Sequence, residues 1–184
     1  MGVDPREVAR EVVERVQAAP PTLGPGRLVC VDGPAGSGKT TLAEALAGVA
    51  PGATVVHCDE LLEGWSGLPG LPATVEGLLR PLAAGRDGRW RRWDWHADAW
   101  AEERVVEPGG LLVLEGVGSW SPAIADLAGL LVWVEAAADV RLARWTARDG
   151  GAMLAHWEQW RLDEQALHDR LETRAHADLV VVTG

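Results

Sequence analysis

The sequence predicts an α/β fold in which helices cover both faces of a five-stranded, mainly parallel sheet. Two observations predict it. Five short apolar runs are separated by stretches with helical patterning, and one run leads through a glycine-rich loop into a helix. The chain has 184 residues, 47% of them hydrophobic, which is enough to bury a proper core. We therefore expect a single three-layer domain over residues 1–184.

The elements can be placed along the chain in order. Residues 1–21 hold an N-terminal helix, with Asp4 as its N-cap and Pro5 as its first residue, which ends before Pro20. The apolar runs predict strands at 27–32, 53–58, 111–114, 130–134 and 177–182. The stretches between them predict helices at about 41–47, 74–84, 137–148 and 152–174. Residues 86–100, which carry four of the ten tryptophans, are assigned to no element.

The glycine-rich loop after the first strand fits G-x-x-x-x-G-K-[ST], the phosphate-binding P-loop. Its glycines allow backbone N–H groups to converge on phosphate oxygens, and the helix that follows presents its positive N-terminal end to the same anion. Lys39, the only lysine of the chain, is placed for the β- and γ-phosphates, and the Thr40 hydroxyl for Mg²⁺. The residues expected to bind the nucleotide here are Gly33, Ala35, Gly36, Ser37, Gly38, Lys39, Thr40 and Thr41.

Acidic residues follow two predicted strands, at the sheet edge where ligands sit in open α/β folds. Glu115 follows the strand at 111–114, the place where P-loop enzymes hold Mg²⁺. Asp59 follows the strand at 53–58 and is a candidate for orienting an acceptor hydroxyl and accepting its proton, with capping of a turn as the alternative. Asp32, directly before the loop, is expected to stabilise the loop rather than to take part in chemistry.

Three further groups of residues have both a functional and a structural explanation. Three arginines share one face of a predicted helix and could close over the nucleotide or form a solvated surface: Arg141, Arg144 and Arg148. Trp93 and Trp95 could stack on a base, at about 1–3 kcal/mol each, or pack in the core of a chain that has no Phe or Tyr. His96 is a candidate acceptor contact, whereas His57 is expected to be structural.

Composition argues against several classes of protein. The formal net charge of −10 disfavours nucleic acid as a partner. No apolar run is long enough to span a membrane, and the charged N-terminus is unlike a signal peptide. Cys30 and Cys58 are expected to be buried, reduced thiols, as in a cytoplasmic protein. A GTPase is disfavoured because its N-K-x-D loop needs asparagine, which the chain lacks, and an ABC-type ATPase because of the chain's length.

The chain resembles uridine kinases and related nucleoside-kinase-like P-loop kinases over about residues 25–183. The P-loop, the strand that ends in Asp59, the LLVLEG strand that ends in Glu115 and the RLARWTARD segment come in that family's order. The WDW segment at 93–95 is similar to the family's aromatic-Asp-aromatic segment beside the nucleoside, and residues 177–181 are similar to its last strand. The resemblance implies the P-loop NTPase sandwich, with the sheet order 2-3-1-4-5.

The same resemblance implies roles for individual residues. Asp59 would be the catalytic base. The residues that would surround Mg²⁺ are Thr40, Asp59 and Glu115. The acceptor would be met by Asp59, Trp93, Asp94 and His96. A lid at about 137–150 would place Arg141 on the nucleotide, and the residues acting on the transferring phosphoryl group would be Lys39, Arg144 and Arg148.

The leading hypothesis is therefore an ATP- and Mg²⁺-dependent kinase of a small hydroxylated metabolite, with a nucleoside as the first candidate. One alternative is a kinase for another small alcohol, such as a vitamin precursor, a sugar acid or an antibiotic. Another is a nucleotide-binding regulatory module without an acceptor. The partner in the leading hypothesis is a small-molecule acceptor, and the sequence is compatible with a homo-oligomer.

Overall fold

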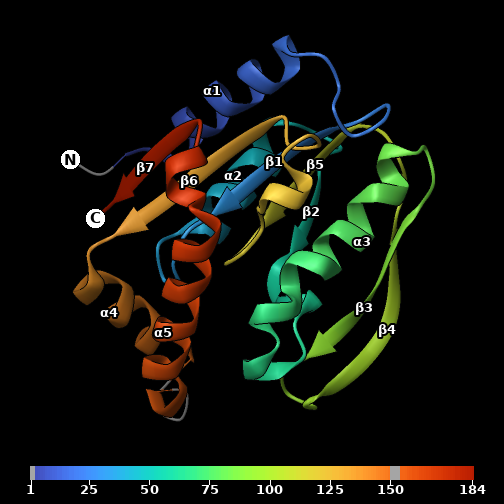
Figure 1. The fold of residues 1–184 in the computed structure, drawn as a ribbon. Coiled ribbons are helices and arrows are strands. Elements are labelled where there is room, and N and C mark those ends of the chain that lie inside the picture. Colours follow the sequence, from blue (N-terminus) through green and yellow to red (C-terminus); the bar gives the residue numbers. More distant parts are fainter. Residues whose placement is uncertain (1–2, 150–153) are drawn as a thin grey trace.

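The computed structural model describes the backbone of residues 3–149 and 154–184 and the side chains of residues 3–147 and 156–184. Its centre is a parallel five-stranded sheet in the order β2-β5-β1-β6-β7 (Figure 1). Its strands are β1 (Arg27–Asp32), β2 (Thr54–His57), β5 (Leu111–Glu115), β6 (Leu130–Ala136) and β7 (Leu179–Thr183). When these strands alone are numbered along the chain, their order is 2-3-1-4-5. The labels differ from that because β3 and β4 form a separate hairpin that the sequence did not predict.

The helices of the described residues are α1 (Pro5–Ala18), α2 (Lys39–Val49), α3 (Leu71–Ala83), α4 (Ala138–Asp149) and α5 (Leu154–Leu171). The start of α1 is confirmed, because the Asp4 side chain accepts a hydrogen bond from the Arg6 N–H and Pro5 stands in the first turn. The start of α3 differs from the prediction: the helix begins at Leu71, before Thr74, and Pro72 occupies its first turn. None of these helices combines the length and the apolar character needed to cross a membrane.

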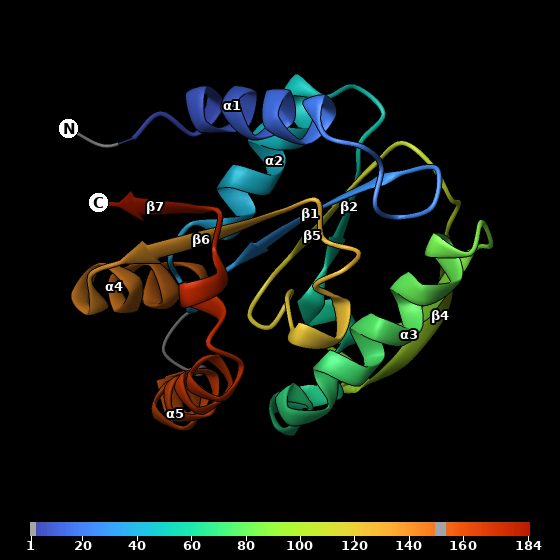
Figure 2. The same cartoon turned by 45° about the horizontal axis from the view of Figure 1, so that its top comes forward.

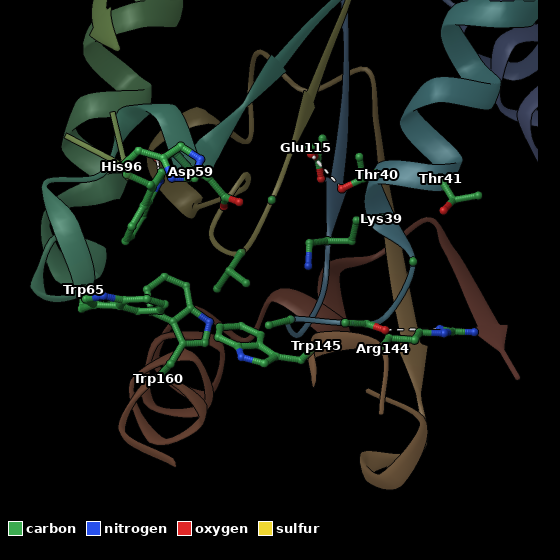
Figure 3. Close-up of a pocket in the computed structure, with 16 residues that line it drawn as sticks. Lys39, Thr40, Thr41, Asp59, Trp65, His96, Glu115, Arg144, Trp145 and Trp160 are labelled. Atoms are coloured by element: carbon green, nitrogen blue, oxygen red, sulfur yellow. Dashed lines mark hydrogen bonds between the residues drawn. The ribbon is translucent and has the colours of Figure 1, made fainter. Parts of the chain in front are cut away.

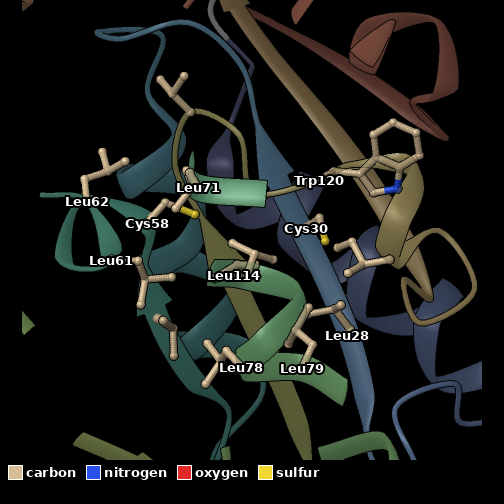
Figure 4. Packing of buried hydrophobic residues seen from close by; sticks show 14 of the residues in the cluster. Leu28, Cys30, Cys58, Leu61, Leu62, Leu71, Leu78, Leu79, Leu114 and Trp120 are labelled. Atoms are coloured by element: carbon tan, nitrogen blue, oxygen red, sulfur yellow. The ribbon is translucent and has the colours of Figure 1, made fainter. Parts of the chain in front are cut away.

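The sheet separates two hydrophobic layers, because alternate residues of a strand point to opposite faces. On one face, α1 and α2 pack against Val29 and Val31 of β1 (Figure 2). On the other, α3 and α5 belong to the layer that contains Leu28, Cys30 and Cys58 (Figure 4). The three-layer arrangement is therefore as predicted. Both cysteines are free and buried, and burial raises their pKa well above the usual range for a thiol, so they act as packing groups.

The tryptophan-rich residues 86–100 lie mostly in an antiparallel hairpin beside α3, formed by β3 (Gly88–Asp94) and β4 (Ala99–Val106) (Figure 1). Trp93 of β3 is 6% exposed and meets Trp100 of β4 edge to face, with ring centroids 5.1 Å apart. Asp94 closes the turn, since its carboxylate accepts hydrogen bonds from the backbone N–H groups of His96 and Ala97. These hydrogen bonds lower the pKa of Asp94.

Candidate active site

The P-loop connects β1 to α2 and is packed closely against α4. Gly36 adopts a φ of +76°, and a Cβ atom there would lie 2.6 Å from the Arg141 carbonyl oxygen, so the position suits only glycine. The Lys39 Nζ donates a hydrogen bond to the Pro34 carbonyl at 3.0 Å, which lays the side chain across the loop. The start of α2 at Lys39 therefore places its N-terminus and one amine at the same spot, as an anion site requires.

Strand pairing brings Glu115 to the P-loop. The register of β1 with β5 sets Val31 opposite Glu115, and the register of β2 with β5 sets His57 opposite the same residue. The Thr40 hydroxyl donates to Glu115 Oε1 at 3.2 Å, and His57 Nδ1 lies 2.5 Å from that oxygen. The hydrogen bond to Glu115 raises the pKa of His57. His57, expected to be structural, thus adjoins the candidate metal position.

The pair formed by Thr40 and Glu115 fits a Mg²⁺ ion that arrives together with a nucleotide. In kinase sites Mg²⁺ is usually held by one or two carboxylates, while phosphates and water supply the other ligands. Among the described side chains there is no cluster of three or more His, Cys, Asp or Glu residues that could hold a metal ion. A single hydroxyl and carboxylate beside the P-loop therefore suit an ion whose remaining ligands come from the substrate.

A pocket of about 670 Å³ lies over the P-loop, which is in the size range of small-molecule sites. Lys39 and Thr40 lie on one side of it, and Asp59 and His96 lie on the other (Figure 3). Asp59 is in η1 (Cys58–Leu61), which continues directly from β2, and its carboxylate is directed into the pocket. The sequence-predicted residues that line the pocket are Ala35, Gly36, Gly38, Lys39, Thr40, Thr41, Asp59, His96, Glu115 and Arg144.

Four tryptophans also line this pocket, and only Trp95 was a stacking candidate from the sequence. Trp65, in η2 (Gly64–Ser66), is the centre of the group, with its ring centroid 5.0 Å from that of Trp95, 6.0 Å from Trp145 and 5.7 Å from Trp160. The Trp95 Nε1 donates to the Asp59 carbonyl oxygen at 3.0 Å. These four tryptophans form the aromatic wall of the pocket, and the hydrogen bond of Trp95 fixes this wall to the segment that carries the Asp59 carboxylate.

Two of the predicted acceptor contacts, Trp93 and Asp94, do not line the pocket. Trp93 belongs to β3 and is buried against Trp100 of β4, whereas Trp95 lies in the turn after β3 and lines the pocket. Asp94 is engaged in the hairpin turn and in an ion pair with Arg92, 3.1 Å away. The structure thus gives both residues a role within the hairpin, and their predicted contact with an acceptor finds no support in this geometry.

Asp32 stabilises the loop region, as expected from the sequence. Its side chain is fully buried and accepts hydrogen bonds from the backbone N–H of Gly33 at 2.7 Å and from those of Gly118 and Trp120 at 3.0 Å. His168 Nε2 lies 3.0 Å from the same carboxylate. Asp32 therefore joins the start of the P-loop to the loop that follows β5. Gly33 and Ser37, predicted to bind nucleotide, lie in the loop but do not line the pocket, and Ser37 is fully buried.

The predicted row of lid arginines does not act as one group. Arg144 lines the P-loop pocket, and its guanidinium donates to the Gly36 carbonyl at 3.2 Å and to Thr183 Oγ1 at 2.9 Å. Arg141 lines a different pocket and pairs with Glu164 at 3.0 Å. The side chain of Arg148 lies outside the described residues. A solvated surface is therefore the wrong explanation for Arg141 and Arg144, because both bind P-loop carbonyls.

Comparison with known proteins agrees with the resemblance predicted from the sequence. Residues 73–152, which include α4, match the model of the Phosphoribulokinase / Uridine kinase family. A possible uridine kinase from Bacillus stearothermophilus is 20% identical, with 93% of this chain and 99% of that one covered and a TM-score of 0.59. A protein described as a fructose transport system kinase, from Silicibacter sp. TM1040, is 24% identical, with 97% and 99% covered and a TM-score of 0.65. No protein of curated function matches the chain.

The family match and the P-loop lie in different parts of the chain and agree with one another. The family match covers Glu115 and α4 but not the P-loop at 33–41. At the identities found, the solved structures show a common fold and no more. The chain is thus similar in fold to a possible uridine kinase, and its residues 73–152 match the Phosphoribulokinase / Uridine kinase family model.

Proposed function

Starting from this uridine-kinase-like fold, we propose that the protein transfers the γ-phosphoryl group of ATP to a hydroxyl of a small metabolite. The observation that carries the proposal is that Lys39, Glu115 and Asp59 line one pocket, with Lys39 and Asp59 on opposite sides (Figure 3). A site that only binds nucleotide does not need a carboxylate opposite the phosphate loop. A kinase needs one to orient the acceptor hydroxyl and accept its proton.

The residues with proposed roles lie on two sides of the pocket. The P-loop amides and Lys39 would bind the β- and γ-phosphates, and Thr40 with Glu115 would hold Mg²⁺. When bound, Mg²⁺ supplies charge neutralisation at the phosphate oxygens. Asp59 would orient the acceptor hydroxyl toward the γ-phosphate and take its proton late in the transfer. Arg144, which already borders the loop, would add positive charge on the nucleotide side.

The aromatic wall favours an acceptor that carries a flat ring, and a nucleoside remains the first candidate. Trp65 and Trp95 are half-buried and meet at an interplanar angle of 64°, so they form a corner in which one indole can stack on a ring and the other can meet its edge. The cations that line the pocket, Lys39 and Arg144, both contact the P-loop. An uncharged ring fits the wall beside Asp59 better than a second phosphate group does.

The proposal is tested by two measurements on the wild-type protein. Calorimetry with a nonhydrolysable ATP analogue and Mg²⁺ measures nucleotide binding. A coupled assay of ADP release then screens nucleosides, sugars and vitamin precursors as acceptors. We expect analogue binding and acceptor-dependent ADP release with at least one class. Analogue binding with no acceptor-dependent release would favour a regulatory module, and absence of analogue binding would contradict the P-loop assignment itself.

Replacement of Trp65 by leucine should weaken acceptor binding and leave nucleotide binding nearly unchanged. The change removes one side of the aromatic corner, and base–aromatic stacking is worth about 1–3 kcal/mol, so the acceptor KM should rise about 5- to 160-fold. Trp100→Leu is the matched control, because Trp100 is also half-buried and packs against a tryptophan but does not line the pocket. A rise in the KM for ATP instead would assign the wall to adenine.

Replacement of Arg144 by alanine should lower kcat more than it weakens ATP binding. A cation that meets charge growing on the transferring phosphoryl group acts mainly in the transition state, and loss of such a contact costs about 10²-fold in kcat. Steady-state kinetics and calorimetry measure the two effects, and Arg89→Ala, on the exposed face of the hairpin, is the control. A loss of stability with kcat intact would make Arg144 only a structural contact of the P-loop.

A further inference from the structure

We infer that Glu164 of α5 is a positioning residue for the P-loop, and that Arg141 acts on the nucleotide site through it. The inference rests on the proposed kinase function and goes beyond it, because neither residue lines the nucleotide pocket. In this arrangement the phosphate-binding loop is held in place by a helix far along the chain, since Ala35 and Glu164 are 129 residues apart.

The carboxylate of Glu164 holds one peptide group of the P-loop. It is 2% exposed, and its Oε2 accepts a hydrogen bond from the Ala35 N–H at 2.8 Å. The Arg141 guanidinium completes the arrangement, since one of its N–H groups donates to Glu164 Oε1 at 3.0 Å and also lies 3.2 Å from the Ala35 carbonyl oxygen. The donor and the acceptor on either side of Ala35 are therefore both held by side chains from outside the loop.

A second contact one helical turn further along α5 holds the beginning of the same loop. His168 Nε2 lies 3.0 Å from Asp32, whose carboxylate in turn accepts the Gly33 N–H at 2.7 Å. Residues 164 and 168 are four apart, so they face the loop from the same side of the helix. Pro34, between the two held N–H groups, has no N–H of its own, and its carbonyl accepts from Lys39.

This arrangement fixes the first turn of the loop, which the Ser37 N–H closes by donating to the Pro34 carbonyl at 3.2 Å. A buried carboxylate close to the phosphate site repels a bound anion and so raises the free-energy cost of nucleotide binding. A residue with a solely structural role at this position would avoid that cost if it were uncharged. Arg141 neutralises that carboxylate through the ion pair at 3.0 Å. The charge is therefore compensated while the carboxylate keeps its strong hydrogen bond to the loop.

The same face of α5 extends to the opposite end of the site. Trp160, four residues before Glu164, lines the P-loop pocket as part of its aromatic wall. One rigid helix thus carries a wall residue of the proposed acceptor side and the side chain that holds the phosphate loop. A change at Glu164 should consequently alter nucleotide binding and turnover, while the acceptor side, held by Trp65 and Trp95, should be affected much less.

The test compares Glu164→Gln with Glu158→Gln, a control on the same helix whose carboxylate forms an exposed ion pair with Arg161. Nucleotide binding is measured by calorimetry with a nonhydrolysable ATP analogue, at a temperature where urea unfolding shows every variant to be folded. We expect Glu164→Gln to weaken analogue binding about 10-fold and to lower kcat by about 10- to 100-fold, because small displacements of binding groups have effects of this size. The acceptor KM should change less than about threefold.

A double-mutant cycle with Arg141→Gln separates positioning from direct contact. In Glu164→Gln alone, the new amide cannot accept from both Ala35 and Arg141. With Arg141 also replaced, the side-chain amide at position 164 can again accept the Ala35 N–H, so the double variant should recover most of the analogue affinity. Additive losses would mean that Arg141 contacts the nucleotide itself, and would overturn its role through Glu164.

Two variants of His168 test the hold of α5 on the loop if Glu164→Gln does not fold. His168→Gln retains a donor near the position of Nε2 and should bind the analogue normally, whereas His168→Leu should bind it more weakly. Binding equal to that of the wild type in Glu164→Gln, or in His168→Leu where Glu164→Gln does not fold, would overturn the inference while leaving the kinase function intact. Absence of analogue binding by the wild type would instead contradict the proposed function.

Discussion

Replacement of Lys39 by alanine is expected to lower kcat by at least about 10²–10³-fold, the cost of removing one preorganised group that stabilises transition-state charge. Lys39 is buried at the start of α2, and its amine is already held over the loop by the Pro34 carbonyl. The substitution removes the charge that would meet the β- and γ-phosphates, so the affinity for ATP should fall as well. ADP release and calorimetry with a nonhydrolysable analogue measure the two effects.

The composition of the chain offers an independent check on Lys39. Because it is the only lysine, an amine-specific reagent has no target besides Lys39 and the N-terminal amine. Mass spectrometry of peptides should find Lys39 labelled slowly, and protected further when the ATP analogue and Mg²⁺ are bound. Arg6→Ala, at the exposed start of α1, is a suitable control for the loss of one positive charge. Turnover close to that of the wild type in Lys39→Ala would contradict the P-loop kinase proposal.

The parts of the site that follow from the sheet could be predicted from the sequence. Parallel strands end at a common edge of the sheet, so acidic residues placed directly after two apolar runs are expected to lie near the P-loop. Glu115 and Asp59 both line the pocket for this reason. The contact of His57 with Glu115 follows from the same logic, because β2 and β5 are neighbours in the order 2-3-1-4-5 and place these residues opposite one another.

The aromatic wall could not be predicted because no local pattern places it. Trp65 lies in a glycine-rich segment, Trp145 and Trp160 lie on two helices, and only tertiary packing brings them together. The hairpin was missed for a different reason. Its strands mix tryptophan with arginine and glutamate, and this hides the alternation of apolar and polar residues that normally identifies a strand. With the hairpin unknown, Trp93 and Trp95 looked equivalent, although Trp93 belongs to β3 and Trp95 to the turn that follows it.

The contacts of α5 with the P-loop show a further limit of sequence patterns. Glu164 and His168 lie on a helix with several other charged residues, and their spacing equals that of an ordinary solvated face. Their burial becomes visible only when α5 is packed beneath the loop, where Ala35 and Asp32 supply the partners. Asp32, in contrast, could be interpreted as a stabilising residue from the sequence. It lies between a buried strand and a tight loop, a place that allows its side chain few other roles.

Replacement of Asp59 by asparagine should lower kcat by about 10²–10⁴-fold, the range expected when a general base is lost. Asparagine keeps the size and much of the hydrogen bonding of the side chain but cannot accept the proton of the acceptor hydroxyl. Nucleotide binding should survive, since the P-loop and Lys39, on the opposite side of the pocket, supply most of it (Figure 3). Some loss of Mg²⁺ affinity is expected if the carboxylate also contacts the metal's water shell.

The control for Asp59→Asn is the same change at the next residue, Glu60→Gln. Glu60 pairs with Arg104 at 2.9 Å and does not line the pocket, so its replacement should leave turnover within about twofold of the wild type, as surface ion pairs contribute little. Turnover from ADP release is compared with analogue affinity from calorimetry for both variants. Near-normal turnover in Asp59→Asn would remove Asp59 from the mechanism and leave Glu115 as the next candidate. Joint loss of analogue binding and turnover would assign Asp59 to the metal site or to folding, because a base that acts only on the acceptor has no effect on nucleotide affinity.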